Sequence, residues 1–187
     1  MNSNTVRKPR IFTIGHSDRS LDQFLRILEK SSIRLVIDVR SNPASSRFPH
    51  FERAALASEL EKRGLVYRWF RGLGGQRKTN PLGSRHTALS EEWQRNYAEA
   101  MNTDDFKGRV EELFGLAAST VAVILCSERD PIHCHRRFLS DKLSIAGADL
   151  VHIIDEQTVT AHDVHPDLVA ADGIMLYQRK QLDLIQS

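Results

Sequence analysis

The segment from Leu125 to Arg137 holds the residue types best suited to chemistry. Its sequence, LCSERDPIHCHRR, contains both cysteines of the chain and two of its eight histidines. A thiolate is a strong nucleophile and a soft metal ligand, and an imidazole exchanges protons near neutral pH. The apolar run VAVI, which immediately precedes the segment, is typical of a buried strand. The pattern therefore predicts a reactive group at the point where a strand ends and a helix follows.

Cys134 has the better surroundings for a reactive thiol. We expect it in the first turn of a helix that begins near Pro131, beside His135 and Arg136, where unpaired amides and cations favour the thiolate. Cys126, at the end of the preceding strand, is the second candidate. Each thiol also has a plainer interpretation as a buried core residue, because cysteine is among the most buried residue types.

The same thiols and histidines are the soft ligands that zinc prefers. Their spacing argues against a zinc site, because Cys126 and Cys134 are eight positions apart and the adjacent pair Cys134 and His135 would point in different directions on a helix. We predict no bound metal, and the sequence leaves the cofactor unknown, with zinc the less favoured alternative.

The elements that must position this segment alternate along the chain. Strand-like runs occupy residues 10–15, 33–40, 65–70, 120–127 and 150–154, with helical patterns between them. The first helix is predicted to begin at Ser20, where Gln23 completes a capping box. Alternating strands and helices form βαβ units, which build a mostly parallel sheet. We therefore expect an α/β protein with a single three-layer domain, its mostly parallel sheet flanked by helices.

A length of 187 residues fits one domain. Within it, we expect residues 1–9 to be a flexible N-terminus and residues 155–187 to be a C-terminal extension packed on the domain. No run approaches the roughly 20 apolar residues of a membrane helix, and the first residues lack the apolar core of a secretory signal. Two cysteines do not make a disulfide scaffold. These features predict a cytoplasmic protein without a membrane partner and with an unknown oligomeric state.

Polar residues follow nearly every predicted strand, and ligands of open parallel sheets bind at that edge. The candidates for catalysis are Cys134, Cys126, Glu128, His16 and Asp38. The candidates for binding an anionic substrate are Arg40, Arg47, Arg77, His135 and Arg136. A thiol would react, a carboxylate or His16 would transfer protons, and the cations would recognise charge. The alternative for the charged residues is a set of ion pairs and hydrogen bonds that hold loops in place.

The charge distribution suggests what the partner is. Residues 34–85 contain eleven Lys and Arg against four Asp and Glu, although the net charge of the chain is only +2. A basic segment favours an anionic small molecule, with phosphate or a nucleotide as examples, or a nucleic acid. We thus expect an enzyme acting on an anionic substrate at the strand ends. The alternative is a non-catalytic nucleic-acid-binding or regulatory module that uses residues 34–85, with the glycine-rich loop GLGGQRK as part of its surface.

Four motifs occur in order along the chain: TIGHS, DVRSNPASSRF, LGG followed by an arginine, and CSERDPIHCHR. With these motifs the sequence resembles the domain-of-unknown-function 488 family of small bacterial and archaeal proteins, over about residues 11–152. The family has no established activity. The resemblance implies a compact α/β domain and a shared site at the motif residues, and it implies no substrate.

Overall fold

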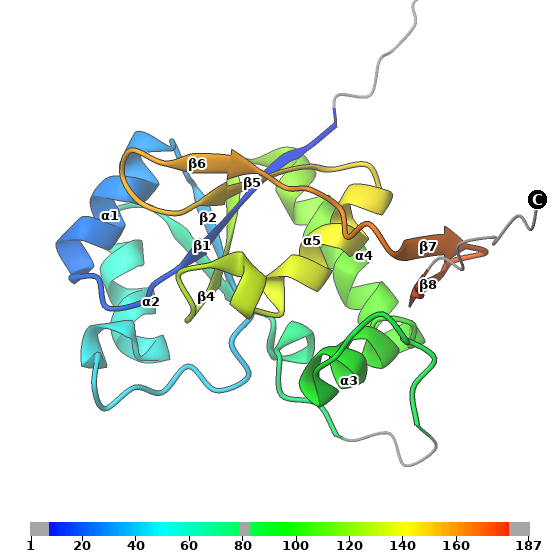
Figure 1. Ribbon diagram of the computed structural model, residues 1–187. Coiled ribbons are helices and arrows are strands. Elements are labelled where there is room, and N and C mark those ends of the chain that lie inside the picture. The colour runs from blue at the N-terminus through cyan, green and yellow to red at the C-terminus, as the bar shows by residue number, and fades with distance from the viewer. Residues whose placement is uncertain (1–7, 79–82, 180–187) are drawn as a thin grey trace, which may run out of the picture.

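The computed structural model describes residues 8–78 and 83–179 (Figure 1). Most of the predicted flexible N-terminus, residues 1–7, and the end of the predicted C-terminal extension, residues 180–187, lie outside the described residues. Within the described ranges, no helix is long and apolar enough to span a bilayer.

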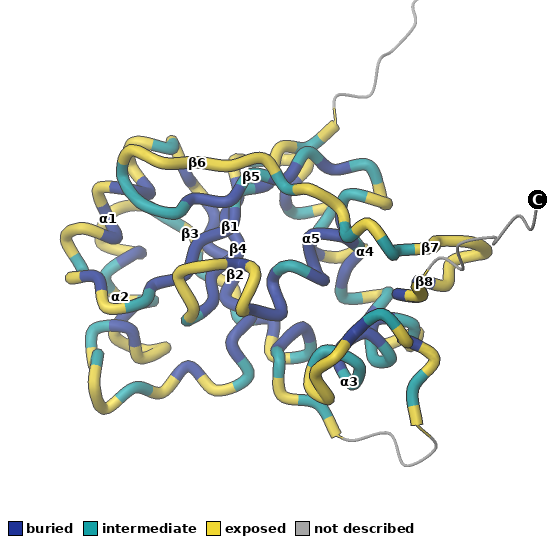
Figure 2. The backbone as a smooth tube through the Cα atoms, in the orientation of Figure 1, coloured by how far each residue is buried: buried dark blue, intermediate teal, exposed yellow. Residues whose placement is uncertain are grey.

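The centre of the molecule is a sheet of six strands in the order β3-β2-β4-β1-β5-β6. The strands are β1 (Arg10–Gly15), β2 (Leu35–Asp38), β3 (Val66–Trp69), β4 (Ala122–Cys126), β5 (Asp149–Ile153) and β6 (Val159–Ala161). The first five are parallel, and β6 runs antiparallel to β5. A separate antiparallel pair consists of β7 (Leu168–Ala171) and β8 (Ile174–Tyr177). Figure 2 shows the central strands β2 and β4 buried along their whole length, whereas β6 and β7 are largely exposed and the edge strand β3 is exposed or half-buried.

Helices cover both faces of this sheet. They are α1 (Leu21–Lys30), α2 (Arg53–Glu61), α3 (Glu92–Ala100), α4 (Asp104–Ser119) and α5 (Arg136–Ile145). One apolar core joins α1 and α2 to the sheet, and a larger one joins α3, α4, α5 and β8 to the opposite face. In β2, alternate residues divide between the two cores: Val36 faces α1 and α2, and Ile37 faces the other layer. The expected three-layer α/β fold is confirmed.

The predicted start of α1 is also confirmed. The Ser20 hydroxyl accepts a hydrogen bond from the Gln23 amide at 3.2 Å, and the Gln23 side chain accepts one from the Ser20 amide at 3.0 Å. This capping box satisfies two amides that would otherwise lack partners in the first turn. Before this helix, the amides of His16 and Ser17 donate to the carbonyls of Cys126 and Ser127 at 2.9 and 2.8 Å, which keeps both residues beside the end of β4.

The connections create a crevice between β2 and β4. After β2 the chain passes through α2 on one face to the edge strand β3, whereas after β4 it passes through α5 on the other face to β5. Loops that leave neighbouring strands in opposite directions open a gap at the carboxyl edge of the sheet. The residues that follow Asp38 and Cys126 therefore face a common hollow.

Candidate functional site

Two sulfur atoms and one imidazole nitrogen meet in this crevice. Cys126 ends β4, and Cys134 and His135 directly precede α5. The Nδ1 atom of His135 lies 3.8 Å from the Sγ atoms of both Cys126 and Cys134, and all three atoms lie within 4.8 Å of one another. All three residues are buried, and both cysteines are free thiols. We call Cys126, Cys134 and His135 the cysteine–histidine cluster.

The backbone around Cys134 differs from the predicted one. Pro131–His133 form a single 3₁₀ turn, capped by the Asp130 carboxylate on the Ile132 amide at 2.8 Å. Cys134 is then extended (φ −133°, ψ 145°), and the helix begins only at Arg136. The prediction that Cys134 lies in the first turn of a helix is therefore wrong. Because one residue of extended backbone separates the two turns, the adjacent side chains of Cys134 and His135 converge instead of diverging.

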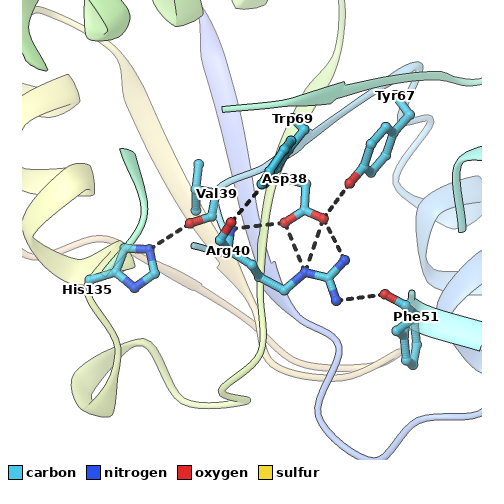
Figure 3. Close-up of polar contacts among 7 residues, drawn as sticks. All are labelled: Asp38, Val39, Arg40, Phe51, Tyr67, Trp69 and His135. Atoms are coloured by element: carbon cyan, nitrogen blue, oxygen red, sulfur yellow. Dashed lines mark hydrogen bonds and ion pairs between the residues drawn. The ribbon is translucent and has the colours of Figure 1, made fainter. Parts of the chain in front are cut away.

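A carbonyl group orients the imidazole of His135. Its Nε2 donates to the carbonyl of Val39, just after β2, at 3.2 Å (Figure 3). With the proton on Nε2, the lone pair on Nδ1 faces the two sulfur atoms. The ring centroids of Tyr97 and His135 lie 5.2 Å apart. The backbone of Gly75 packs so closely against the imidazole that a Cβ atom at position 75 would lie 2.6 Å from Nδ1. The imidazole is thus held between the loop after β2, through Val39, and the loop after β3, through Gly75.

Arg136 supports Cys134 instead of facing the crevice. Its side chain is 1% exposed, and its Nε donates to the Cys134 sulfur at 3.4 Å. Its other nitrogens donate to the Thr13 hydroxyl at 3.2 Å and to the carbonyls of Glu128 and Arg129. The structure therefore places this predicted anion-binding residue behind the cluster, with its donors engaged by the protein itself.

The two thiols have pKa values that diverge. The proximity of the two thiols raises the pKa of Cys126 and lowers the pKa of Cys134. Burial raises the pKa of Cys126 further, while His135 and the cationic Arg136 lower the pKa of Cys134. Cys134 is consequently the sulfur that ionises first.

Asp38 and Arg40 form a buried ion pair at the end of β2 (Figure 3). The Asp38 carboxylate accepts from Arg40 Nε at 2.9 Å and Nη2 at 2.5 Å, and from the Tyr67 hydroxyl at 2.6 Å. Arg40 also donates to the Phe51 carbonyl. Asp38, predicted as a catalytic candidate, is fully buried and engaged by these donors. It acts here by holding Arg40 at the floor of the crevice.

His16 lies at the end of β1. Its Nδ1 donates to the Ser17 carbonyl at 2.9 Å, and its ring stacks on Phe51 at 4.4 Å between centroids. Burial lowers the pKa of His16 to about 4, so the imidazole is neutral at pH 7. A neutral imidazole with a bonded Nδ1–H presents Nε2 as a proton acceptor and not as a cation.

The crevice has two connected hollows. The first, about 270 Å³, is lined by the cysteine–histidine cluster with His133, Ser41, Gly75 and Trp93. The second, about 500 Å³, is lined by His16, Ser45 and Arg47. Arg40, Asn42, Ser127 and Glu128 line both hollows. The exposed side chains of Glu128 and Arg47 therefore stand at the opening, as a carboxylate and a cation that a ligand would meet.

Arg77 lies outside this crevice. Its guanidinium stacks over the rings of Tyr97 and Phe106 at 5.4 and 5.3 Å, and its Nη2 donates to the Gly72 carbonyl at 2.6 Å. Of the ten predicted site residues, the structure thus gathers Cys126, Cys134, His135, Glu128, His16, Arg40 and Arg47 around the two hollows. It places Asp38 and Arg136 as buried supports and Arg77 elsewhere.

Sequence reasoning missed a buried polar chain behind the cluster. The Thr13 hydroxyl lies 2.7 Å from Nδ1 of His152, Nε2 of His152 lies 2.9 Å from Nδ1 of His162, and Nε2 of His162 lies 2.9 Å from Asp141. Tyr177 also donates to Asp141, at 2.8 Å. His152 carried a signal, since it lies in the fifth predicted strand. No pattern in the sequence indicated His162 or Asp141, because only the packing of β6 against α5 brings these two residues together.

The chain matches the family model described as "Domain of unknown function DUF488" over residues 20–143. The chain belongs to this family. The matched range contains three of the four motifs, including both cysteines, and begins just after TIGHS. No curated protein and no solved structure matches the chain. Within the DUF488 match, the motif residues after β2 and β4 are those that line the crevice.

Proposed function

We propose that this protein is an enzyme that binds a small anionic substrate, such as a phosphorylated metabolite or nucleotide, in the crevice between β2 and β4. The observation that carries the proposal is the convergence of Cys126, Cys134 and His135 beside a hollow at the point where the strand connections diverge. The cysteine–histidine cluster is its reactive centre, and the cytoplasm, where thiols stay reduced, is its proposed compartment.

The arrangement of the cysteine–histidine cluster favours a catalytic role for these residues over a purely structural role in the core. A sulfur beside an imidazole that is itself oriented by a third group is the usual arrangement of an activated thiol. Here that third group is the Val39 carbonyl. Glu128, exposed at the opening of both hollows, is the carboxylate positioned to exchange protons with a bound ligand.

Two arginines support the choice of an anion. Arg40 lines both hollows and uses three of its five N–H groups on Asp38 and Phe51, which leaves two for a ligand. Arg47 is exposed beside the second hollow, and among the described residues it forms no ion pair. An arginine pair of this kind suits the bidentate recognition of a phosphate or carboxylate group.

The alternative function, a nucleic-acid-binding or regulatory module on residues 34–85, has weaker support. Trp69, the most prominent aromatic of that segment, donates Nε1 to the Arg40 carbonyl, and Arg53 lies over its ring at 4.4 Å. Gly75 packs tightly against His135. A ring already covered by arginine offers little surface for base stacking.

The proposal is tested by binding and turnover. We expect inorganic phosphate, pyrophosphate or AMP to bind in calorimetry, and Arg47→Ala to weaken that binding by roughly 10- to 100-fold, the worth of a charged hydrogen bond. Arg63→Ala is the matched control, because Arg63 is an exposed arginine of the same basic segment that lines a different hollow, beside α1. Equal losses in the two variants would favour diffuse binding to the basic surface.

Turnover distinguishes an enzyme from a binding module. If product analysis finds that a bound anion is converted, His135→Gln should convert it at least roughly 100-fold more slowly. Unchanged turnover in His135→Gln would remove the cluster from the reaction.

A further inference from the structure

We propose that the cysteine–histidine cluster is a binding site for a soft divalent metal ion, Zn²⁺ by its ligand chemistry, with Cys126 Sγ, Cys134 Sγ and His135 Nδ1 as the three protein ligands. The inference deepens the proposed function and rests on it in one respect: the ion would be the reactive group of the same crevice. The binding of metal is itself independent of any substrate.

The spacing of the three atoms is that of a tetrahedral site. Zinc–sulfur and zinc–nitrogen bonds of about 2.3 and 2.05 Å place two tetrahedral ligands about 3.6 Å apart for sulfur and nitrogen and about 3.8 Å apart for two sulfurs. In this structure Nδ1 of His135 lies 3.8 Å from each sulfur, and no two of the three atoms are more than 4.8 Å apart. The two sulfur–nitrogen distances need to shorten by about 0.2 Å, and the two sulfurs, within 4.8 Å of each other, need to approach by at most about 1 Å to close the geometry around an ion.

The partners of the ligands are those that metal sites use. A metal-binding histidine usually donates its other ring N–H to a carbonyl or carboxylate, and His135 donates Nε2–H to the Val39 carbonyl. The backbone amide and Nε of Arg136 both point at the Cys134 sulfur, at 3.5 and 3.4 Å. N–H donors of this kind stabilise a bound thiolate and orient it.

The charges also balance. Two thiolates neutralise a divalent ion, and the buried guanidinium of Arg136 then lies beside a neutral centre instead of beside a second cation. Of the two sequence arguments against zinc, the spacing of Cys126 and Cys134 and the divergence of adjacent side chains, the second assumed that Cys134 and His135 lie on one helix. It does not apply, because Cys134 is extended and both side chains face the same point.

The fourth position of the site faces the first hollow, whose lining includes all three ligands. Three protein ligands with an open fourth position is the arrangement of catalytic zinc, whereas structural sites have four protein ligands. When bound, such an ion would polarise an oxygen of the anionic substrate. The structure thus assigns to the crevice a place for a ligand oxygen directly beside the ion.

Cobalt and zinc titrations of the reduced full-length protein, after treatment with a chelator, test the site. We expect Co²⁺ to bind with one equivalent per chain and to produce a thiolate-to-cobalt charge-transfer band together with the visible bands of a tetrahedral ion. Zn²⁺ should displace it. Cys126→Ser, Cys134→Ser and His135→Ala should each lose the band and weaken Zn²⁺ binding by more than about 100-fold, beyond the 10- to 100-fold typical of losing only a hydrogen-bond partner of a ligand.

His133→Ala is the matched control, because His133 lines the same hollow two residues from the ligand His135 and contributes no atom to the cluster. It should bind both ions like the wild type. A folded wild-type protein that gives no charge-transfer band would overturn the metal site, as would a band that persists in the double variant Cys126→Ser, Cys134→Ser. A disulfide that re-forms between the two cysteines and prevents metal binding would also overturn it.

A second measurement does not depend on folded variants. In the wild type, Zn²⁺ should protect both thiols from alkylation, as counted by mass spectrometry, and a chelator should restore alkylation; unprotected thiols at saturating Zn²⁺ would contradict the site. Pyrophosphate binding, measured with and without metal, separates the two proposals. Metal binding without anion binding would retire the proposed function alone, and anion binding without any metal binding would retire the metal site alone.

Discussion

Arg136 and Asp141 are buried charges of opposite sign on α5 that are joined through side chains of other elements. Arg136 donates to Thr13, and the distances from Thr13 to His152, from His152 to His162 and from His162 to Asp141 are 2.7, 2.9 and 2.9 Å. If each group donates to the next, every proton in this series of hydrogen bonds points from the cation toward the anion, and both histidines donate from Nε2. The chain therefore holds Arg136, and through it the Cys134 sulfur, in one orientation.

Asp141→Asn should destabilise the protein by about 3 kcal/mol. The amide cannot accept hydrogen bonds from both His162 and Tyr177 as the carboxylate does, and the series of hydrogen bonds that begins at Arg136 then no longer ends at an anion. Urea unfolding measures the change. Asp163→Asn, at an exposed position, serves as the control and should stay within about 0.5 kcal/mol of the wild type. A small change in the free energy of unfolding for Asp141→Asn would mean that the hydrogen bonds from Arg136 to Asp141 contribute little to stability.

Stability should fall as the pH decreases from about 7 to 4. Burial, followed by the electrostatic effects of the neighbouring His162 and Arg136, lowers the pKa of His152 from 6.5 to about 4. In this pH window His152 is protonated in the unfolded chain but stays neutral in the folded protein. The free energy of unfolding therefore decreases, by up to roughly 3 kcal/mol for a pKa shift of this size. Urea midpoints measured across the window should show a shallower slope for His152→Gln. An identical slope would contradict a neutral, buried His152.

Gly75→Ala should displace the imidazole of His135, because a Cβ at position 75 would lie 2.6 Å from Nδ1. We expect a loss of about 1–3 kcal/mol in stability from overpacking, together with slower turnover of any substrate found. Gly115→Ala is the control: a Cβ at this exposed position in α4 meets nothing within 4 Å, so it should stabilise the helix by about 0.5–1 kcal/mol. If Gly75→Ala behaved like Gly115→Ala, the close packing of the loop on His135 would be refuted.

Arg40→Met should cost about 3–5 kcal/mol, because it leaves the Asp38 carboxylate buried without its cation. The double variant Asp38→Asn, Arg40→Met should lose clearly less than the sum of the two single variants, since it removes both charges together. Thermal and urea unfolding of the three proteins gives the interaction free energy. Additive losses would show that Asp38 and Arg40 act independently.

Much of the architecture was predictable from local patterns. The apolar strands, the capping box at Ser20 and the alternation of elements all follow from side-chain periodicity within a dozen residues, and they were sufficient for the three-layer α/β class. The same alternation implied that residues after β2 and β4 would meet at one edge of the sheet, which placed Cys126, Glu128 and Arg40 near one another. These inferences held because each depends on neighbours in sequence or on a general rule of parallel sheets.

The roles within the site depended on the tertiary structure. No pattern in the sequence shows that the Asp38 carboxylate is hydrogen-bonded by Arg40 and Tyr67. The sequence also does not show that Arg136 points away from the crevice toward Thr13, or that His162 and Asp141 lie behind the crevice. One extended residue at Cys134 decided whether two adjacent side chains diverge or converge. Side-chain direction and hydrogen-bond partners are set by packing between elements far apart in the chain, and local sequence does not encode that packing in a form that can be read position by position.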